Sequence, residues 1–145
     1  MDKNNIINEI HSRSKSTLVE NLGIEITDVG ENFICGKMPV DKRTKQPYGL
    51  LHGGASVALA ETLGSIGGGM QINLKSDSIV GIEINANHLK SIKKGWVFGK
   101  AEALRIGNKI QVWDINIKDE TNNLVCKSRL TLAVIKNNDR KSNNK

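Results

Sequence analysis

The fold is decided by residues 49–72, GLLHGGASVALAETLGSIGGGMQI, where one acidic residue, Glu61, stands among small and apolar neighbours. Apolar residues recur there at helical spacing, which predicts a helix over residues 53–71; they are Ala55, Ala58, Leu59, Leu63 and Ile66. The run Gly67-Gly68-Gly69 should fray or end this helix, because each helical glycine costs about 1 kcal/mol relative to alanine. The seven glycines and the lack of an aromatic belt favour a helix buried inside a globular protein over a membrane span.

The flanking sequence predicts one antiparallel sheet. A patchy helix at residues 6–22 ends at Gly23, and a hairpin over 24–29 and 33–40 turns at Gly30-Glu31-Asn32. Beyond the central helix the apolar period becomes two around residues 82–86, and further strands are expected at 96–106, 109–118 and 124–135. We therefore expect an α+β fold, a curved sheet wrapped around one helix, with a helical segment at 1–22, the folded domain at 23–136 and a disordered basic tail at 137–145.

Composition narrows the function classes. The net charge is +6, but residues 136–145 carry four basic residues and one acidic, 4 − 1 = +3, and aromatic residues are only 3% of the chain. With no nucleic-acid-binding motif, these features argue against a nucleic-acid partner. The polar N-terminal segment and only two cysteines, Cys35 and Cys126, lead us to expect a reduced cytoplasmic protein that has no disulfide framework and does not associate with membranes.

Glu61 is the first candidate for chemistry. A buried carboxylate costs several kcal/mol unless it is partnered or neutralised, and its raised pKa suits a general base or nucleophile. The alternative is a structural glutamate that pairs with an arginine or faces solvent. No Lys or Arg lies within one helical turn, which favours function. Ser65 shares the face of Glu61 and could hold a water or the carboxylate, or simply bond to a backbone carbonyl.

The pair Gly53-Gly54 after His52 is the second candidate. A helix beginning there has unpaired N–H groups at its positive end, which could form an oxyanion or phosphate site; a simple tight turn is equally compatible. His52 and Glu61 are nine residues apart, about 13.5 Å along one helix and on opposite faces. If both act on one substrate, two subunits must bring their helices side by side.

A set of basic residues follows, near strand ends, and indicates either a solvated sheet edge or a site for a phosphate-bearing ligand. Its members are Lys90, Lys93, Lys94, Lys100, Arg105 and Lys109.

The sequence also resembles a known family. The run MPVDKRTKQPYGLLHGGASVALAETLGS at 38–65, with GIEINANHLK at 81–90 and GNKIQVW at 107–113, is similar to the hotdog-fold acyl-CoA thioesterases. Within them it most resembles the branch with the 1,4-dihydroxy-2-naphthoyl-CoA thioesterase of menaquinone synthesis and the proofreading thioesterase of enterobactin synthesis. The similarity covers residues 22–135. It implies a homodimer with active sites between subunits, often assembled as a dimer of dimers, which agrees with the distance constraint above.

The resemblance also implies roles for individual residues. Glu61 would attack the thioester or activate water, and the Gly53 N–H of the other subunit would polarise the carbonyl. Gln46 and His52 would line the thioester and leaving thiol, and Ser65 would position the water or Glu61. No metal or other cofactor is implied. The coenzyme A nucleotide would meet His88, Lys90, Asn108 and Lys109.

Two departures from the family concern the substrate. Lys90 stands where relatives often carry Arg, and lysine lacks the bidentate fork of arginine. Residues 67–70 are smaller than the bulky segment associated with the acyl pocket in relatives.

We therefore expect hydrolysis of an acyl-CoA, first an aryl-CoA such as 1,4-dihydroxy-2-naphthoyl-CoA. A broad housekeeping or proofreading thioesterase is the alternative. The complete QPYGLLHGG…E pattern disfavours a hotdog hydratase. A non-catalytic acyl-CoA-binding module would need a partner domain, for which 145 residues leave no room.

Overall fold

The structure is a computed structural model that describes residues 2–137. Across these residues six strands form one sheet in the order β1-β2-β4-β5-β6-β3, and all neighbours are antiparallel. The strands are β1 (Glu25–Val29), β2 (Phe33–Pro39), β3 (Asp77–His88), β4 (Trp96–Ile106), β5 (Ile110–Lys118) and β6 (Leu124–Lys136). Except for Asn137, the predicted basic tail lies outside the described residues.

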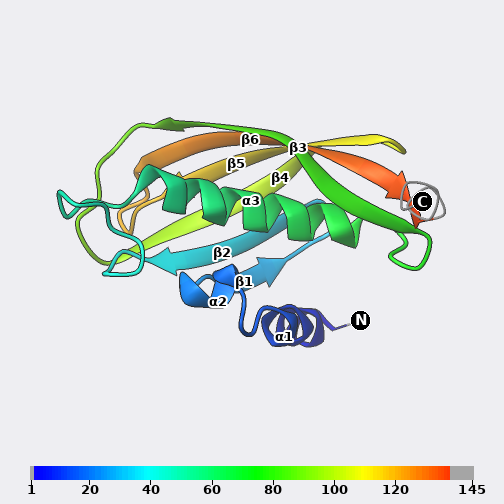
Figure 1. Ribbon diagram of the computed structural model, residues 1–145, viewed down its shortest axis with the longest axis horizontal. Coiled ribbons are helices and arrows are strands. Elements are labelled where there is room, and N and C mark those ends of the chain that lie inside the picture. The colour runs from blue at the N-terminus through cyan, green and yellow to red at the C-terminus, as the bar shows by residue number, and fades with distance from the viewer. Residues whose placement is uncertain (1, 138–145) are drawn as a thin grey trace, which may run out of the picture.

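Helix α3 (Gly53–Met70) lies along one face of the curved sheet and contacts β2 to β6 (Figure 1). Its side chains Leu59, Ala60 and Leu63 are completely buried against the sheet. Burying such an apolar stripe is the main stabilisation of a helix in a fold of this size. The α+β architecture expected from the sequence is confirmed.

The glycine run inside α3 behaves differently from our expectation. The helix continues through Gly67-Gly68-Gly69 to Met70, so the prediction that these residues would fray or end it was wrong. A Cβ on Gly67 would lie 2.9 Å from the buried Trp113 ring, and one on Gly68 would lie 2.9 Å from Gln111 Oε1. Gly67 and Gly68 let the helix approach the sheet closely, and this packing outweighs the low helix propensity of the run.

The N-terminal segment forms two helices instead of the one expected. They are α1 (Lys3–Arg13) and α2 (Leu18–Asn21), separated by a turn in which Ser16 has a positive φ of 59°. Helix α1 packs beside β1 (Figure 1). The Ile26 N–H donates to His11 Nε2 at 2.9 Å, and Lys3 forms an ion pair with Asp28.

Candidate active site

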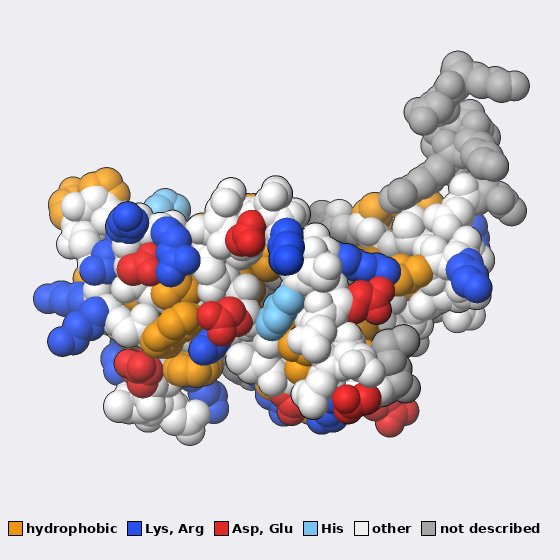
Figure 2. All heavy atoms as spheres, turned by 90° about the horizontal axis from the view of Figure 1, so that it is seen from below, with side chains coloured by type: hydrophobic (Ala, Val, Ile, Leu, Met, Phe, Trp, Pro, Cys, Tyr) orange, Lys and Arg blue, Asp and Glu red, His pale blue; other side chains and the backbone are white. Residues whose placement is uncertain are grey.

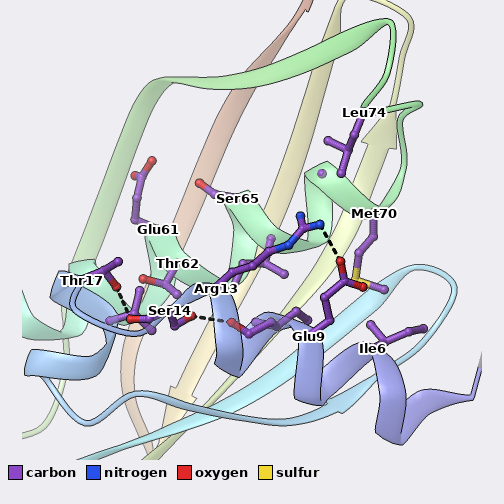
Figure 3. Close-up of a pocket in the computed structure, with 14 residues that line it drawn as sticks. Ile6, Glu9, Arg13, Ser14, Thr17, Glu61, Thr62, Ser65, Met70 and Leu74 are labelled. Atoms are coloured by element: carbon purple, nitrogen blue, oxygen red, sulfur yellow. Dashed lines mark hydrogen bonds and ion pairs between the residues drawn. The ribbon is translucent and has the colours of Figure 1, made fainter.

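Glu61 is one of the residues of α3 and the N-terminal helices that line a cavity of about 640 Å³, and its carboxylate points away from α1 (Figure 3). The residues that line the cavity are mostly apolar or small, and Glu61 is half-buried among them. They are Ile6, Glu9, Ile10, Arg13, Ser14, Thr17, Val19, Glu61, Thr62, Ser65, Ile66, Gly69, Met70 and Leu74. The predicted pair Glu61 and Ser65 is therefore brought together in one cavity.

The surroundings of Glu61 tune its ionisation. Burial raises the pKa of the Glu61 carboxyl above its ordinary value, and a hydrogen bond with the Ser65 side chain offsets part of this rise. A carboxylate whose charged form is poorly solvated is a stronger base and nucleophile than one in water. This environment suits a carboxylate that takes a proton from water or attacks a carbonyl carbon.

Gly81 of β3 makes room for this carboxylate, and sequence reasoning missed it. A Cβ on Gly81 would lie 2.7 Å from Glu61 Oε1, well inside ordinary contact distance. The pairing of β3 with β6 also shifts register between Gly81 and Glu83, so the strand bulges at this point. A glycine inside a strand pattern signals such a bulge or a close approach, and that signal was present in the sequence.

A second cavity, of about 330 Å³, lies at the beginning of α3. Gln46, Gly53, His88 and Lys90 all line it, so four of the predicted residues meet there. A Cβ on Gly53 would lie 2.8 Å from His88 Nε2, which shows how closely the helix start approaches the end of β3. Within the described residues the Gly53 N–H has no acceptor, as expected for the first residue of a helix.

Gln46 presents a defined group to this second cavity. Its Oε1 accepts from the Tyr48 N–H, and its backbone N–H donates to the Leu50 carbonyl at 2.8 Å, so the loop holds the side chain in place. With Oε1 engaged, the amide NH₂ of Gln46 is the group left to donate to a ligand.

His52 faces a different space from Gln46 and Gly53. It is the N-cap of α3, where its Nδ1 accepts from the Gly54 N–H at 2.8 Å, and it lines a separate cavity of about 270 Å³ with Thr44 and Ala58. Within one chain, the structure therefore does not bring His52 together with the residues predicted to share its role.

The four residues expected at the coenzyme A nucleotide lie in two separate places within one chain. Lys90 forms an ion pair with Asp119 at 2.5 Å and, like His88, lies where β3 ends. Asn108 and Lys109 lie in the turn between β4 and β5, at the opposite end of β3 from His88. The adjoining Ile110 pairs with Ala133 of β6, and Ala133 pairs on its other side with Val80 of β3. Val80 and His88 are eight residue steps apart on β3, about 26 Å of extended strand.

Lys100, another of the basic residues noted in the sequence, has an acidic partner. Lys100 pairs with Glu102 at 2.7 Å, and on the face that carries α1 basic and acidic side chains are intermixed (Figure 2). This distribution favours the solvated-edge interpretation for Lys100. In the part of the chain that is described, no three His, Cys, Asp or Glu side chains are grouped to hold a metal ion. None of the described helices has the length and apolarity needed to cross a membrane.

A half-buried carboxylate beside a hydroxyl at an apolar cavity can act as a base or a nucleophile toward an activated acyl group. Comparison with known proteins gives the family: residues 48–126 match the thioesterase superfamily, and the chain belongs to it. The protein is thus a thioester hydrolase with the hotdog fold, which confirms the resemblance seen in the sequence.

Individual relatives agree with this assignment. The chain is 44% identical over 126 residues to the 1,4-dihydroxy-2-naphthoyl-CoA hydrolase of Escherichia coli, covering 87% of this chain and 92% of the relative. It is 47% identical over 126 residues to the proofreading thioesterase EntH of Cronobacter turicensis, covering 87% and 91%. The crystal structure of a Haemophilus influenzae thioesterase superposes with a TM-score of 0.86 at 47% identity, covering 90% of each chain. Because these relatives are named as hydrolases, the comparisons favour an enzyme over a non-catalytic acyl-CoA-binding module.

Proposed function

We propose that this protein hydrolyses acyl-CoA thioesters, with an aryl-CoA such as 1,4-dihydroxy-2-naphthoyl-CoA as its first candidate substrate. The observation that carries the proposal is Glu61, a carboxylate whose pKa is raised by burial on the wall of an apolar cavity. The substrate suggestion is supported by the name of the Escherichia coli relative, and the alternative, a broad proofreading role, by the name of EntH.

In the proposed reaction, Glu61 either attacks the thioester carbonyl or removes a proton from the attacking water. In the first route, acyl transfer to Glu61 breaks the C–S bond and releases coenzyme A, and water then hydrolyses the mixed anhydride to free Glu61 and the acid. In the second, water adds to the carbonyl, the C–S bond breaks, and the proton that Glu61 took from water passes to the leaving thiolate. The Gly53 N–H would donate to the developing oxyanion, an interaction typically worth about 10²–10³ in rate. Ser65 would position Glu61 or the water, and Gln46 would donate to the carbonyl or the thiol. No metal or cofactor is required.

We further propose that the active site is completed by a second copy of the chain in a homodimer. Glu61 and Gly53 line different cavities, so one chain does not bring them to a common point. Strand β3 is an edge strand and exposes Ile82, and edge strands readily pair with another chain. An antiparallel β3–β3 pairing would bring Gly81, and with it Glu61, toward the end of the partner's β3, which lies next to the start of the partner's α3. Glu61 would then face the partner's helix start; pairing of two such dimers would give the tetramer.

The same pairing would bring parts of the coenzyme A site together from two chains. In each protomer Asn108 and Lys109 lie far from His88 and Lys90, so only a second subunit could place all four around one nucleotide. The proposed location is the cytoplasm, where both cysteines, Cys35 and Cys126, would stay as the free thiols seen in the structure.

The substrate proposal is tested by thiol release from a panel of aryl- and aliphatic-CoA thioesters. Highest kcat/KM on an aryl-CoA supports the pathway enzyme, whereas similar values across the panel support the housekeeping alternative. Absence of thiol release from every member would contradict the proposal.

The role of the Gly53 N–H can be isolated with two substitutions. Gly53→Pro removes the donor at the first helical position, where proline is tolerated, and Gly53→Ala adds the same Cβ but keeps the donor. We expect Gly53→Pro to lose about 10²-fold more kcat than Gly53→Ala. Mixing Gly53→Pro with Glu61→Gln subunits should then restore about one quarter of wild-type activity, because half of the dimers would contain one intact site.

A further inference from the structure

Helix α1 forms one side of the cavity that contains Glu61 (Figure 3). It contributes one face of the helix, at spacings of three and four residues. Across the cavity lie Ile66, Gly69 and Met70 of α3. The residues of α1 on this face are Ile6, Glu9, Ile10 and Arg13.

Helix α1 packs only partly against the core, through Ile6, Ile7 and Ile10. None of its residues is buried, and Ile6 and Ile10 remain half-exposed although they are large and apolar. The helix is held from its other side, by the hydrogen bond from Ile26 to His11 and the ion pair of Lys3 with Asp28. Beside the ion pair of Glu9 with Arg13, the two isoleucines of this face are thus fixed over the cavity, and their burial under an apolar ligand would be favourable.

The cavity combines the helix that carries Glu61 with a wall from outside the family match. Residues 48–126 match the thioesterase superfamily, whereas α1 spans residues 3–13. The carboxylate and the helix that carries it belong to the matched span, whereas α1 lies outside it, as β1 and β2 also do. An acyl group that extends from Glu61 along α3 would have α1 beside it.

We propose that α1 is the acyl-selectivity wall of this enzyme, and that Ile10 sets how long an apolar acyl group can lie between α1 and α3. The inference deepens the proposed function, since it rests on an acyl group reacting at Glu61. From Glu61 to Met70 the helix axis advances about 13.5 Å. An extended chain covers about 3.6 Å per three bonds, so about eleven bonds fit along this length. The substrate class is an apolar acyl group of up to about ten carbons, aliphatic or aryl-alkyl.

The test compares kcat/KM for decanoyl-CoA and propionyl-CoA in the wild type and in Ile10→Trp. We expect the added ring to fill the space beside α3 and to lower the decanoyl-to-propionyl ratio at least tenfold, because a few methylenes in an apolar pocket change rates by this much or more. Ile10→Phe adds less volume to the cavity and should lower the decanoyl-to-propionyl ratio in the same direction. This variant replaces Ile10→Trp in the test if the tryptophan variant does not fold.

Ile7→Ala is the matched control. Ile7 lies on the same helix, is half-buried and packs against the core as Ile10 does, but it does not line the cavity. Ile7→Ala loosens the packing of α1 without filling the cavity, so the decanoyl-to-propionyl ratio of kcat/KM should change less than twofold. An unchanged ratio in both Ile10 variants, or an equal change in Ile7→Ala, would overturn the proposal. Dissociation of an oligomer by Ile10→Trp with no change in the ratio would mean that a second copy covers this face, and would overturn it too.

A binding measurement separates this proposal from the proposed function. Non-hydrolysable decyl- and propyl-thioether analogues of coenzyme A are titrated calorimetrically into the wild type and Ile10→Trp. If α1 is the wall, decyl-CoA loses at least tenfold in affinity in the variant and propyl-CoA does not, even if Glu61 proves not to be catalytic. Equal affinities in both proteins would refute the wall whatever the hydrolysis assay shows.

Discussion

Substituting Gly81 by alanine tests the placement of the Glu61 carboxylate. The new Cβ would lie 2.7 Å from Glu61 Oε1, whereas ordinary contact begins at 3.4 Å, so the oxygen must move by about 0.7 Å. Since a misplacement of 1 Å can cost about 10²-fold, we expect kcat to fall by about 10- to 30-fold. The displaced atom is the end of a flexible side chain, so the free energy of unfolding should change little.

A double-mutant cycle shows whether this loss acts through Glu61. We expect Gly81→Ala to reduce thiol release in the wild type and to have no further effect in Glu61→Gln, because the group that it displaces no longer reacts. Urea denaturation of all four proteins serves as the control for folding. The reasoning is refuted if Gly81→Ala leaves kcat unchanged, or if it lowers kcat by the same factor in both backgrounds.

Three further predictions concern ionisation, packing and the nucleotide. Burial raises the pKa of Glu61, and the reaction needs the charged form of this residue, so activity should fall on acidification at a pH above the ordinary glutamate range. Ser65→Ala removes the hydrogen bond that lowers this pKa, so the acid limb of the kcat/KM profile should move to higher pH. Gly67→Ala should destabilise the fold by about 1–3 kcal/mol in urea titrations through overpacking, whereas Gly69→Ala, which meets nothing within 4 Å, should be neutral or stabilising. Lys90→Ala should raise KM for acyl-CoA but not for the matching acyl-pantetheine, and equal increases would contradict a contact with the nucleotide.

The sequence predicted the elements whose pattern is local. Turn residues marked the strands at 96–106 and 124–135 to within a residue, and helical spacing identified α3. It failed at Gly67-Gly68-Gly69, because their helical state depends on the sheet residues Trp113 and Gln111, which are distant in sequence. It also joined α1 and α2, because nothing marked Ser16 as the residue with a positive φ.

The candidate site was predictable where one helix determines it. Glu61 and Ser65 share a helical face by their spacing, and the separation of His52 from Glu61 followed from helix geometry. The contact of Gly53 with His88 and the space that Gly81 leaves for Glu61 depend on how β3 packs against α3. Such contacts between elements cannot be obtained from a period in the sequence.

The central claim is that Glu61 carries the hydrolysis, and the most direct measurement is single-turnover thiol release from the best acyl-CoA by the wild type and Glu61→Gln. Glutamine keeps the size of the side chain but can neither act as a base nor attack the carbonyl. We predict a loss of about 10³-fold or more, with binding of a thioether analogue unchanged. Thiol release within tenfold of the wild type would contradict the account and place the chemistry on another residue.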